Sequence, residues 1–143
     1  MKYLNLMTVS LGLALSIASL TAVAAEAAAG KEKVVMQVSD ADTGKWNLAL
    51  NNAKNVQQSY GADKIDVEIV VYGPGIGMLK ADSAVGSRIE EAKAAGVKVV
   101  ACENTMKASK LTKADMLPDT SYVPSGVVEL IQKERAGYAY IRP

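Results

Sequence analysis

The chain has 143 residues, and its 16 basic and 15 acidic side chains leave a formal net charge of +1. A balance this even provides no basic surface, which argues against nucleic acid and anionic membranes as partners. Histidine is absent and cysteine occurs once. This composition excludes Ser-His-Asp and Cys-His catalysis, the commonest zinc sites and an internal disulfide. We therefore predict neither a metal site nor a cofactor.

Residues 1–25 have the pattern of a secretory signal peptide. Lys2 supplies a positive charge, an apolar stretch follows, and small residues precede a cleavage site after Ala24 or Ala25. The uninterrupted apolar run is shorter than the roughly 20 residues that a membrane span needs. We expect the cleaved protein to be periplasmic or secreted and to have no membrane attachment. Without Lys2 it has 15 basic and 15 acidic residues.

The rest of the chain predicts one domain, which covers residues 34–143 after a flexible leader at residues 26–33. Apolar runs predict strands at residues 34–38, 66–72, 97–101, 121–123 and 138–142. Helical patterns lie at residues 44–60, with Thr43 as the expected N-cap, and at residues 83–95. A last helix is expected to start at residues 124–126 and to end at Gly137, and short helical pieces are expected near residues 105–109 and 112–116. Strands separated by helices predict an α/β fold, a three-layer α/β/α domain with a mainly parallel sheet of about four or five strands.

The turn after the first strand has one feature of a phosphate loop, because Gly44-Lys45 follows a strand. Ser39 stands where the first glycine is needed, and Trp46 replaces the hydroxyl that would hold magnesium. We interpret this segment as a solvated turn. Trp46 begins the next helix, where its position suits either a core residue or the wall of a ligand pocket.

A glycine loop follows the second strand and contains Gly73, Pro74, Gly75 and Gly77. Backbone N–H groups in such a loop can approach an anion, but the spacing lacks the Rossmann pattern and its downstream acid. The loop is therefore either one wall of a pocket or only a tight connection between a strand and a helix. In a parallel sheet it lies at the same edge as the end of the third strand.

Cys102 ends the third strand, and polar residues suited to begin a helix follow it. This is where parallel sheets place functional groups, beyond a strand and at a helix N-terminus. The thiol is either a nucleophile or an inert buried side chain. A free thiol with a pKa of about 8.5 is a few per cent ionised at pH 7, and a helix N-terminus raises this to about one part in seven. No base accompanies it, so a sulfur carrier is favoured over a stand-alone enzyme.

Three segments of the chain resemble the DsrE/DsrF-like family. They are Tyr72–Gly75, Gly96–Met106 with its Cys-Glu-Asn-Thr-Met element, and Val123–Ile141. The resemblance covers residues 34–143 and implies a compact α/β/α domain that assembles into homo-oligomers. In the sulfur-relay members of the family, a cysteine after a central strand accepts sulfur as a persulfide and passes it on. Cys102 is the matching position.

These observations lead to two main functional hypotheses. In the first, the protein is a periplasmic sulfur carrier that exchanges sulfur with a donor or acceptor protein. Cys102 would hold the persulfide, the backbone amides of Asn104 and Thr105 would stabilise its charge, and the glycine loop and Trp46 would wall the pocket. In the second, the protein is a non-catalytic homo-oligomer that binds a small ligand or anion, and Cys102 is structural. A third hypothesis is a structural subunit that assembles through Val127, Leu130, Tyr138 and Tyr140.

Overall fold

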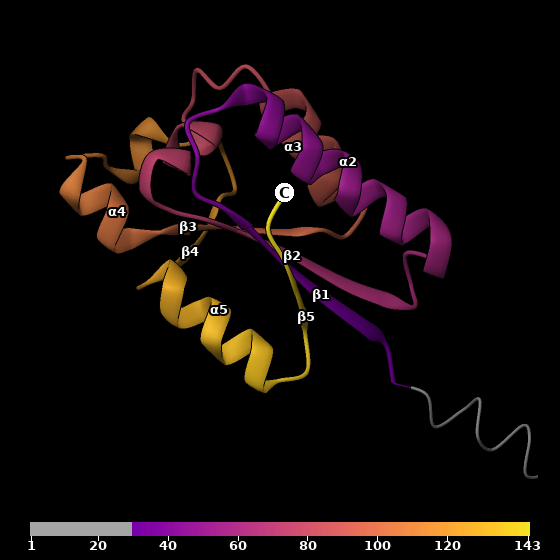
Figure 1. Cartoon of the computed structure of the whole chain (residues 1–143). Coiled ribbons are helices and arrows are strands. Elements are labelled where there is room, and N and C mark those ends of the chain that lie inside the picture. The colour runs from indigo at the N-terminus through magenta and orange to yellow at the C-terminus, as the bar shows by residue number, and fades with distance from the viewer. Residues whose placement is uncertain (1–29) are drawn as a thin grey trace, which may run out of the picture. The chain divides into compact units, whose positions relative to one another are not determined.

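Five parallel strands form one sheet with the order β4-β3-β2-β1-β5 (Figure 1). The structure is a computed structural model that describes residues 30–143; the predicted signal peptide and the start of the predicted leader lie outside the described residues. The strands are β1 (Glu32–Val38), β2 (Ile65–Val71), β3 (Lys98–Cys102), β4 (Ser121–Val123) and β5 (Ala139–Ile141). The predicted α/β fold with a parallel sheet is confirmed.

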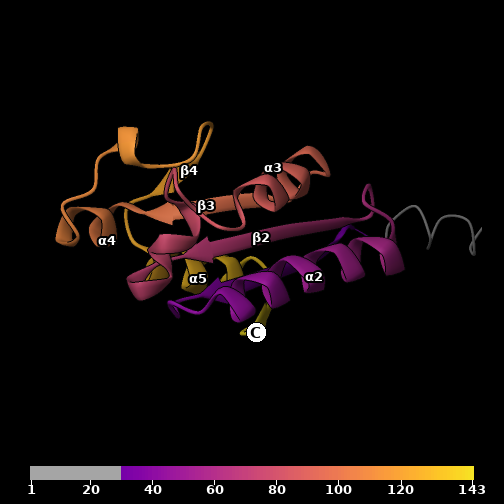
Figure 2. The same cartoon turned by 90° about the horizontal axis from the view of Figure 1, so that it is seen from above.

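Helices connect these strands and cover both faces of the sheet. They are α2 (Thr43–Tyr60), α3 (Gly86–Ala94), α4 (Glu103–Ala108), α5 (Gly126–Arg135) and the 3-10 helices η1 (Gly73–Leu79) and η2 (Lys113–Asp115). Figure 1 and the view from above in Figure 2 show α2 and α3 on one face and α5 on the other. No helix within residues 30–143 is both long enough and apolar enough to cross a membrane.

The register brings the carboxyl ends of the strands to one edge of the sheet. Val38 of β1 lies opposite Val71 of β2, which in turn lies opposite Ala101 of β3. The next residue of β3, Cys102, lies opposite Val123 of β4. Because every pair is parallel, the segments that follow β1, β2, β3 and β4 all begin at this edge. The sheet thereby gathers the loops that form the candidate site.

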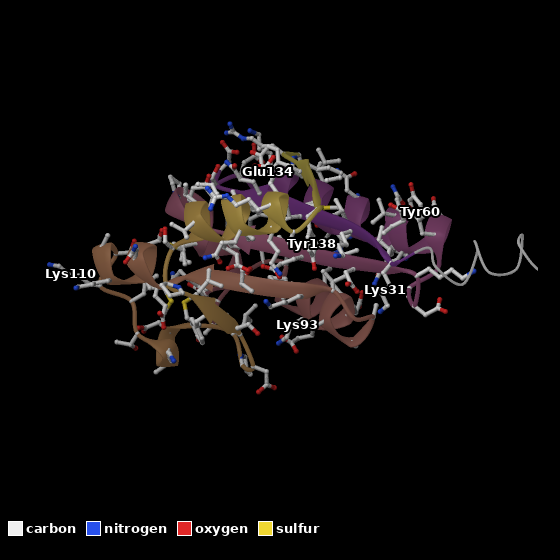
Figure 3. All side chains as sticks on the ribbon, turned by 90° about the horizontal axis from the view of Figure 1, so that it is seen from below. Lys31, Tyr60, Lys93, Lys110, Glu134 and Tyr138 are labelled. Carbon is white, nitrogen blue, oxygen red and sulfur yellow. The ribbon has the colours of Figure 1, made fainter. Side chains whose placement is uncertain are left out.

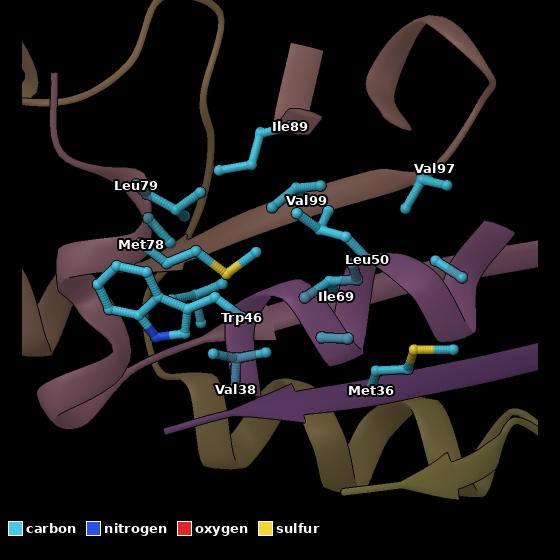
Figure 4. Close-up of a cluster of buried hydrophobic side chains, with 14 of the residues drawn as sticks. Met36, Val38, Trp46, Leu50, Ile69, Met78, Leu79, Ile89, Val97 and Val99 are labelled. Carbon is cyan, nitrogen blue, oxygen red and sulfur yellow. The ribbon is translucent and has the colours of Figure 1, made fainter. Parts of the chain in front are cut away.

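Both faces of the central strands are largely apolar, as expected of a sheet that helices cover on both sides. The larger core lies between the sheet and helices α2 and α3, and Figure 4 shows it with Met36, Val38, Trp46, Leu50, Ile69, Ile89 and Val99 among its members. On the other face Leu130 of α5 packs on Val35, Val70, Val100 and Val123. Full burial of a side chain of this size is worth about 1.5–3 kcal/mol.

Helix α2 begins one residue earlier than the sequence indicates. Asp42 is the N-cap, and its carboxylate accepts the backbone N–H groups of Gly44 at 2.7 Å and Lys45 at 3.2 Å. The prediction of Thr43 as the N-cap is therefore wrong, since Thr43 is the first helical residue. A carboxylate at the positive end of the helix dipole is a stronger acceptor than a hydroxyl.

The glycine loop is more regular than the turn that the sequence predicts, because it forms the 3-10 helix η1. Gly73 has a φ of 54°, which L-residues with a side chain rarely adopt. At Gly75 a Cβ atom would lie 2.6 Å from the carbonyl O of Val38, so the loop packs directly against the end of β1. These two glycines are needed for the local backbone itself.

Candidate functional site

Cys102 occupies the junction between β3 and α4. Its side chain is 4% exposed. The sulfur is the N-cap group of α4 and accepts the backbone N–H of Thr105 at 3.4 Å. The thiol here takes the place of the hydroxyl or carboxylate that usually caps the start of a helix. The sulfur therefore lies at the positive end of a helix, where negative charge is favoured.

Two helices diverge at this junction. Met106 of α4 packs in the core beneath α2 and α3, whereas Leu130 of α5 packs on the opposite face. The starts of the two helices are joined by a hydrogen bond from the backbone N–H of Asn104 to the carbonyl O of Pro124 at 3.2 Å. Cys102 thus lies at the point where the chain leaves neighbouring strands toward opposite faces, the usual ligand position in open α/β sheets.

The surroundings of Cys102 favour its ionised form. Burial alone would raise the pKa of the thiol and is the largest single effect. The polar groups around the sulfur act against burial: the hydroxyl of Thr105, the backbone N–H of Gly126 and the backbone N–H of Thr105 each lower the pKa, and the net pKa lies below the ordinary thiol value. The N–H of Asn104 also lies near the sulfur, but it donates to Pro124. Gly126 is the first residue of α5.

Thr105 connects the thiol to the glycine loop. Its hydroxyl oxygen accepts the backbone N–H of Gly73 at 2.9 Å, which joins α4 to the start of η1. The structure therefore brings Cys102, Thr105 and Gly73 into one hydrogen-bonded group. Pro74 follows Gly73 in the first turn of η1, where a missing N–H costs nothing.

Trp46 and Gly77 lie together in the hydrophobic core. The indole is 9% exposed, and a Cβ atom at Gly77 would lie 3.3 Å from its ring. The indole Nε1–H donates to the carbonyl O of Asp40 at 2.7 Å. The ring thus has its polar group satisfied and its faces packed, as expected of a core tryptophan. Trp46, Gly75 and Gly77 therefore take part in packing, whereas Cys102, Thr105 and Gly73 form the hydrogen-bonded group at the thiol.

Tyr72 and Gly126 belong to the thiol's surroundings, and the sequence reasoning did not select them. A Cβ atom at Gly126 would lie 2.9 Å from Cβ of Tyr72, so only glycine lets α5 begin this close to the end of β2. Burial raises the pKa of Tyr72, and the nearby Tyr140 and Cys102 raise it further, while Arg142 lowers it. The sequence could have indicated them only by their position, because Tyr72 follows the end of β2 and Gly126 begins α5, both at the carboxyl edge of the sheet.

The arrangement offers a single polarised thiol and donors for negative charge. Within residues 30–143 no three acidic or cysteine side chains are grouped so as to hold a metal ion. The thiol itself can act as a nucleophile that bonds covalently to a sulfur or carbon centre.

The fold and the site together define a class, a small α/β/α domain with one polarised thiol at the carboxyl edge of a parallel sheet. A sequence profile of the DsrE/DsrF-like family matches residues 18–143. The chain belongs to this family, which confirms the resemblance noted in the sequence. Membership suggests a role of the sulfur-relay type.

Solved structures agree with this assignment. The chain is similar to a protein of unknown function from Methanobacterium thermoautotrophicum, with 30% identity and a TM-score of 0.75, over 79% of this chain and 100% of that one. It also shares its fold with a conserved protein of unknown function from Bacteroides thetaiotaomicron, with 13% identity and a TM-score of 0.57, over 78% of this chain and 95% of that one. No curated protein matches the chain.

Proposed function

We propose that this protein is an exported sulfur carrier that holds one sulfur atom on Cys102 as a persulfide. The observation that carries the proposal is the capping of α4 by the thiol, in which the backbone N–H of Thr105 donates to the sulfur. Hydrogen bonds of this kind favour the thiolate, which is the nucleophilic form. Membership of the DsrE/DsrF-like family supports the same chemistry.

The loading step is a transfer of neutral sulfur between thiols. The thiolate of Cys102 attacks the outer sulfur of a donor persulfide, R–S–SH, so that a new S–S bond forms at Cys102. The donor's S–S bond breaks, and the donor leaves as the thiolate R–S⁻. The proton stays on the transferred sulfur, and one persulfide replaces another without net oxidation. An acceptor thiolate unloads the carrier by the same reaction in reverse.

The donors that act on the free thiol would also act on the loaded form. The terminal sulfur of a persulfide lies about 2 Å beyond the cysteine sulfur. The backbone N–H groups of Thr105 and Gly126 act on the cysteine sulfur, and the positive ends of two helices meet there. These groups would stabilise the charge of a persulfide anion while it waits for an acceptor.

The proposed partners are a sulfur donor or acceptor protein and further copies of this chain. Export by the predicted signal peptide would place the exchange in the periplasm. Helix α5 exposes Val127, Val128 and Ile131, which are 50%, 48% and 43% exposed. Apolar side chains grouped on one helix support assembly through this face. Chromatography with light scattering tests this proposal, and a monomer would contradict it.

The near-complete burial of Cys102 favours a second candidate, in which the thiol is structural and the protein only binds a ligand. Alkylation by iodoacetamide distinguishes the two functions. A carrier thiol reacts at neutral pH faster than a free peptide cysteine, because its thiolate fraction is raised. A rate no greater than that of the peptide supports the structural role.

The proposal is tested most simply by the state of Cys102 in protein isolated from its own compartment. Intact mass measured without reductant distinguishes a free thiol, a persulfide and a bridge to another chain. A persulfidated fraction that disappears on treatment with a thiol reductant is the expected result. A disulfide between two chains at Cys102 in all of the protein would contradict the carrier role.

A further inference from the structure

Helices α2 and α3 lie next to each other on one face of the sheet (Figure 1), and a groove of about 300 Å³ runs between them. We refer to it as the α2–α3 groove. On one side α3 lines it with Ala92 and Ala95, whose side chains are too small to fill the space. Leu50 of α2 and Val97, both buried members of the larger core, form its floor. The groove is therefore apolar at its base.

Hydrogen bonds between the two helices close the groove at both ends. At one end the guanidinium of Arg88 in α3 donates to Oδ1 of Asn47 and, at 2.7 Å, to Oδ1 of Asn51, both in α2. At the other end Nε2 of Gln57 in α2 donates to the carbonyl O of Ala95 at 2.8 Å. Asn51 and Gln57 are six residues apart, which corresponds to about 9 Å of helix. This length suits a small molecule rather than a docked helix.

The way in which Arg88 is held leaves its charge available. Asparagine is a poor helix former, because its side chain competes with the backbone for hydrogen bonds, yet Asn47 and Asn51 both lie inside α2. Their amide oxygens carry no net charge, so they fix the guanidinium without neutralising it. These contacts use two of the five N–H donors of an arginine. Three donors remain for another acceptor.

The rim of the groove has more positive than negative charge. Lys54 lines it three residues after Asn51, on the same side of α2. Within residues 30–143 no carboxylate forms an ion pair with Arg88 or with Lys54. Glu91 is the one acid among the lining residues, all of which lie in that part of the chain. Two cations and one acid leave an excess of one positive charge.

Lys93 of α3 is placed differently from these two cations. Its ammonium contacts the carboxylate of Glu90 at 3.1 Å and donates to the carbonyl O of Pro118 at 3.0 Å. In Figure 3, Lys93 lies on the opposite side of the molecule from Tyr60, the last residue of α2. Lys93 is thus a cation of the same helix that is already paired and does not line the groove.

We propose that the α2–α3 groove binds a small organic monoanion. Its charged group would contact Arg88 and Lys54, and its apolar part would lie on Leu50 and Val97. An anion that is desolvated on one side gains from a fixed guanidinium, because the donors need no reorganisation to meet it. Glu91 on the rim disfavours a second negative charge on the ligand, which selects a monoanion over inorganic phosphate.

This site is separate from the thiol and goes beyond the proposed carrier function. Val97 precedes β3 and Cys102 ends it, so the floor of the groove and the thiol are roughly 16 Å apart along the strand. Binding in the groove needs no reaction at Cys102, and sulfur transfer at Cys102 needs no ligand in the groove.

The test is a titration of ¹⁵N-labelled protein with hexanoate, followed by the chemical shifts of the backbone amides. We expect saturable shifts in α2 and α3 around the groove. Hexanamide has the same shape without the charge, and it should bind about threefold to tenfold more weakly, as expected for charge contacts at a partly exposed site.

Four variants locate the contacts. Arg88→Met should bring the affinity for hexanoate down to that for hexanamide and leave hexanamide binding unchanged. Lys54→Met should act in the same direction, and it serves if Arg88→Met loosens the helices, because it leaves the hydrogen bonds between them intact. Ala92→Leu fills the groove and should abolish the binding of both compounds. Lys93→Met is the matched control and should bind hexanoate as the wild type does. Circular dichroism establishes that each variant is folded.

Three results would overturn the proposal. The first is equal affinity of the wild type for hexanoate and hexanamide. The second is the absence of saturable shifts at the groove, including a titration in which only the amides around Cys102 respond. The third is a shift of the groove amides with protein concentration alone, which would show that a second copy of the chain covers this face.

The outcome does not depend on whether the protein carries sulfur. Cys102→Ser should bind hexanoate with the affinity of the wild type. If hexanoate binds in the groove while the wild type takes up no sulfur, the binding site stands and the carrier function fails. If the wild type takes up sulfur and hexanoate does not bind, the carrier function stands and the binding site fails.

Discussion

The sulfur of Cys102 caps helix α4 by accepting the backbone N–H of Thr105 at 3.4 Å. A neutral thiol is a weak acceptor, whereas a thiolate is a strong one. Ionisation of Cys102 therefore strengthens the start of α4, and the start of α4 in turn favours ionisation. Because the pKa of the thiol is lower in the folded protein, the free energy of unfolding should rise as the pH increases from the folded pKa to the unfolded one.

Thr105→Val tests the contribution of the hydroxyl at this cap. The variant keeps the side-chain shape but removes the acceptor of the Gly73 N–H and one donor to the sulfur. We expect the free energy of unfolding to fall by about 1 kcal/mol and the thiol pKa to rise. Urea denaturation and alkylation profiles measure the two effects. Thr105→Ser keeps the hydroxyl and is the matched control; an equal change in both variants would argue against this role.

Gly75→Ala should destabilise the protein more than Gly77→Ala. At Gly75 the added methyl would lie 2.6 Å from the carbonyl O of Val38, and backbone atoms in a sheet cannot move aside. At Gly77 it would lie 3.3 Å from the edge of the Trp46 ring, which can shift slightly. We expect a loss of about 1–3 kcal/mol at Gly75 and a smaller one at Gly77. The opposite order in urea denaturation would contradict this packing.

Glu129→Gln should change how stability depends on pH. Burial raises the pKa of Glu129 above its ordinary value of 4.5, and the neighbouring carboxylate of Glu68 raises it further. The folded state therefore holds this proton more tightly than the unfolded state does. The free energy of unfolding of the wild type should fall as the pH rises from 4.5 through the raised pKa. Glutamine does not titrate, so the variant should gain stability relative to the wild type over that range.

The sign of this effect shows whether burial and the Glu68 carboxylate raise the pKa of Glu129 in the folded protein. Denaturation at a series of pH values, in buffers of equal ionic strength, measures it. Lys54→Met removes an exposed charge that is not paired with Glu68 or Glu129, and it serves as the control. A difference between Glu129→Gln and wild type that stays constant from pH 4 upward would show that Glu129 does not titrate abnormally.

Trp46 is the sole tryptophan of the chain, and its fluorescence reports on the core. We expect the emission of a buried indole, unchanged when sulfur is loaded on Cys102. Trp46→Phe should lower the free energy of unfolding by about 1 kcal/mol, because the hydrogen bond to Asp40 is lost. A fluorescence change on loading would instead make Trp46 part of the pocket, as one of the sequence interpretations had it.

The strands were predictable to within about two residues, because a strand covered on both faces is a short, nearly continuous apolar run. Helix starts were less predictable. The second long helix was expected from residue 83, but it begins at Gly86 after a turn in which the Ser83 hydroxyl accepts the N–H of Val85. The place of β5 beside β1 could not be derived, since it depends on the path of α5 across the sheet.

Glu68 illustrates what pattern reasoning misses. The start of its strand alternates between polar and apolar residues, which is typical of a strand with one solvated face. In a sheet covered on both faces, however, a charged residue inside a central strand has to be buried, and Glu68 is paired with lysines from β3 and α5. The strand position was readable from the sequence, but the identity of its partners required the fold.

For the Cys102 thiol, too, the position could be predicted from the sequence but the hydrogen-bond partners could not. The pattern of an apolar strand followed by helix-forming residues indicated the position of Cys102 at the carboxyl edge of the sheet. The group that joins it to the glycine loop is the Thr105 side chain, which the sequence reasoning valued only for its backbone amide. Gly126 comes from a helix that follows the next strand, so its approach to the sulfur depends on how the chain returns.

The central claim is tested most directly by the mass of the protein after exposure to a sulfur donor. Purified protein is incubated with polysulfide, or with thiosulfate and a sulfurtransferase, and its intact mass is measured without reductant. We expect the wild type to gain about 32 Da, one sulfur atom as a persulfide, and Cys102→Ser to gain nothing. No adduct on the wild type, or the same adduct on Cys102→Ser, would contradict a carrier function for Cys102.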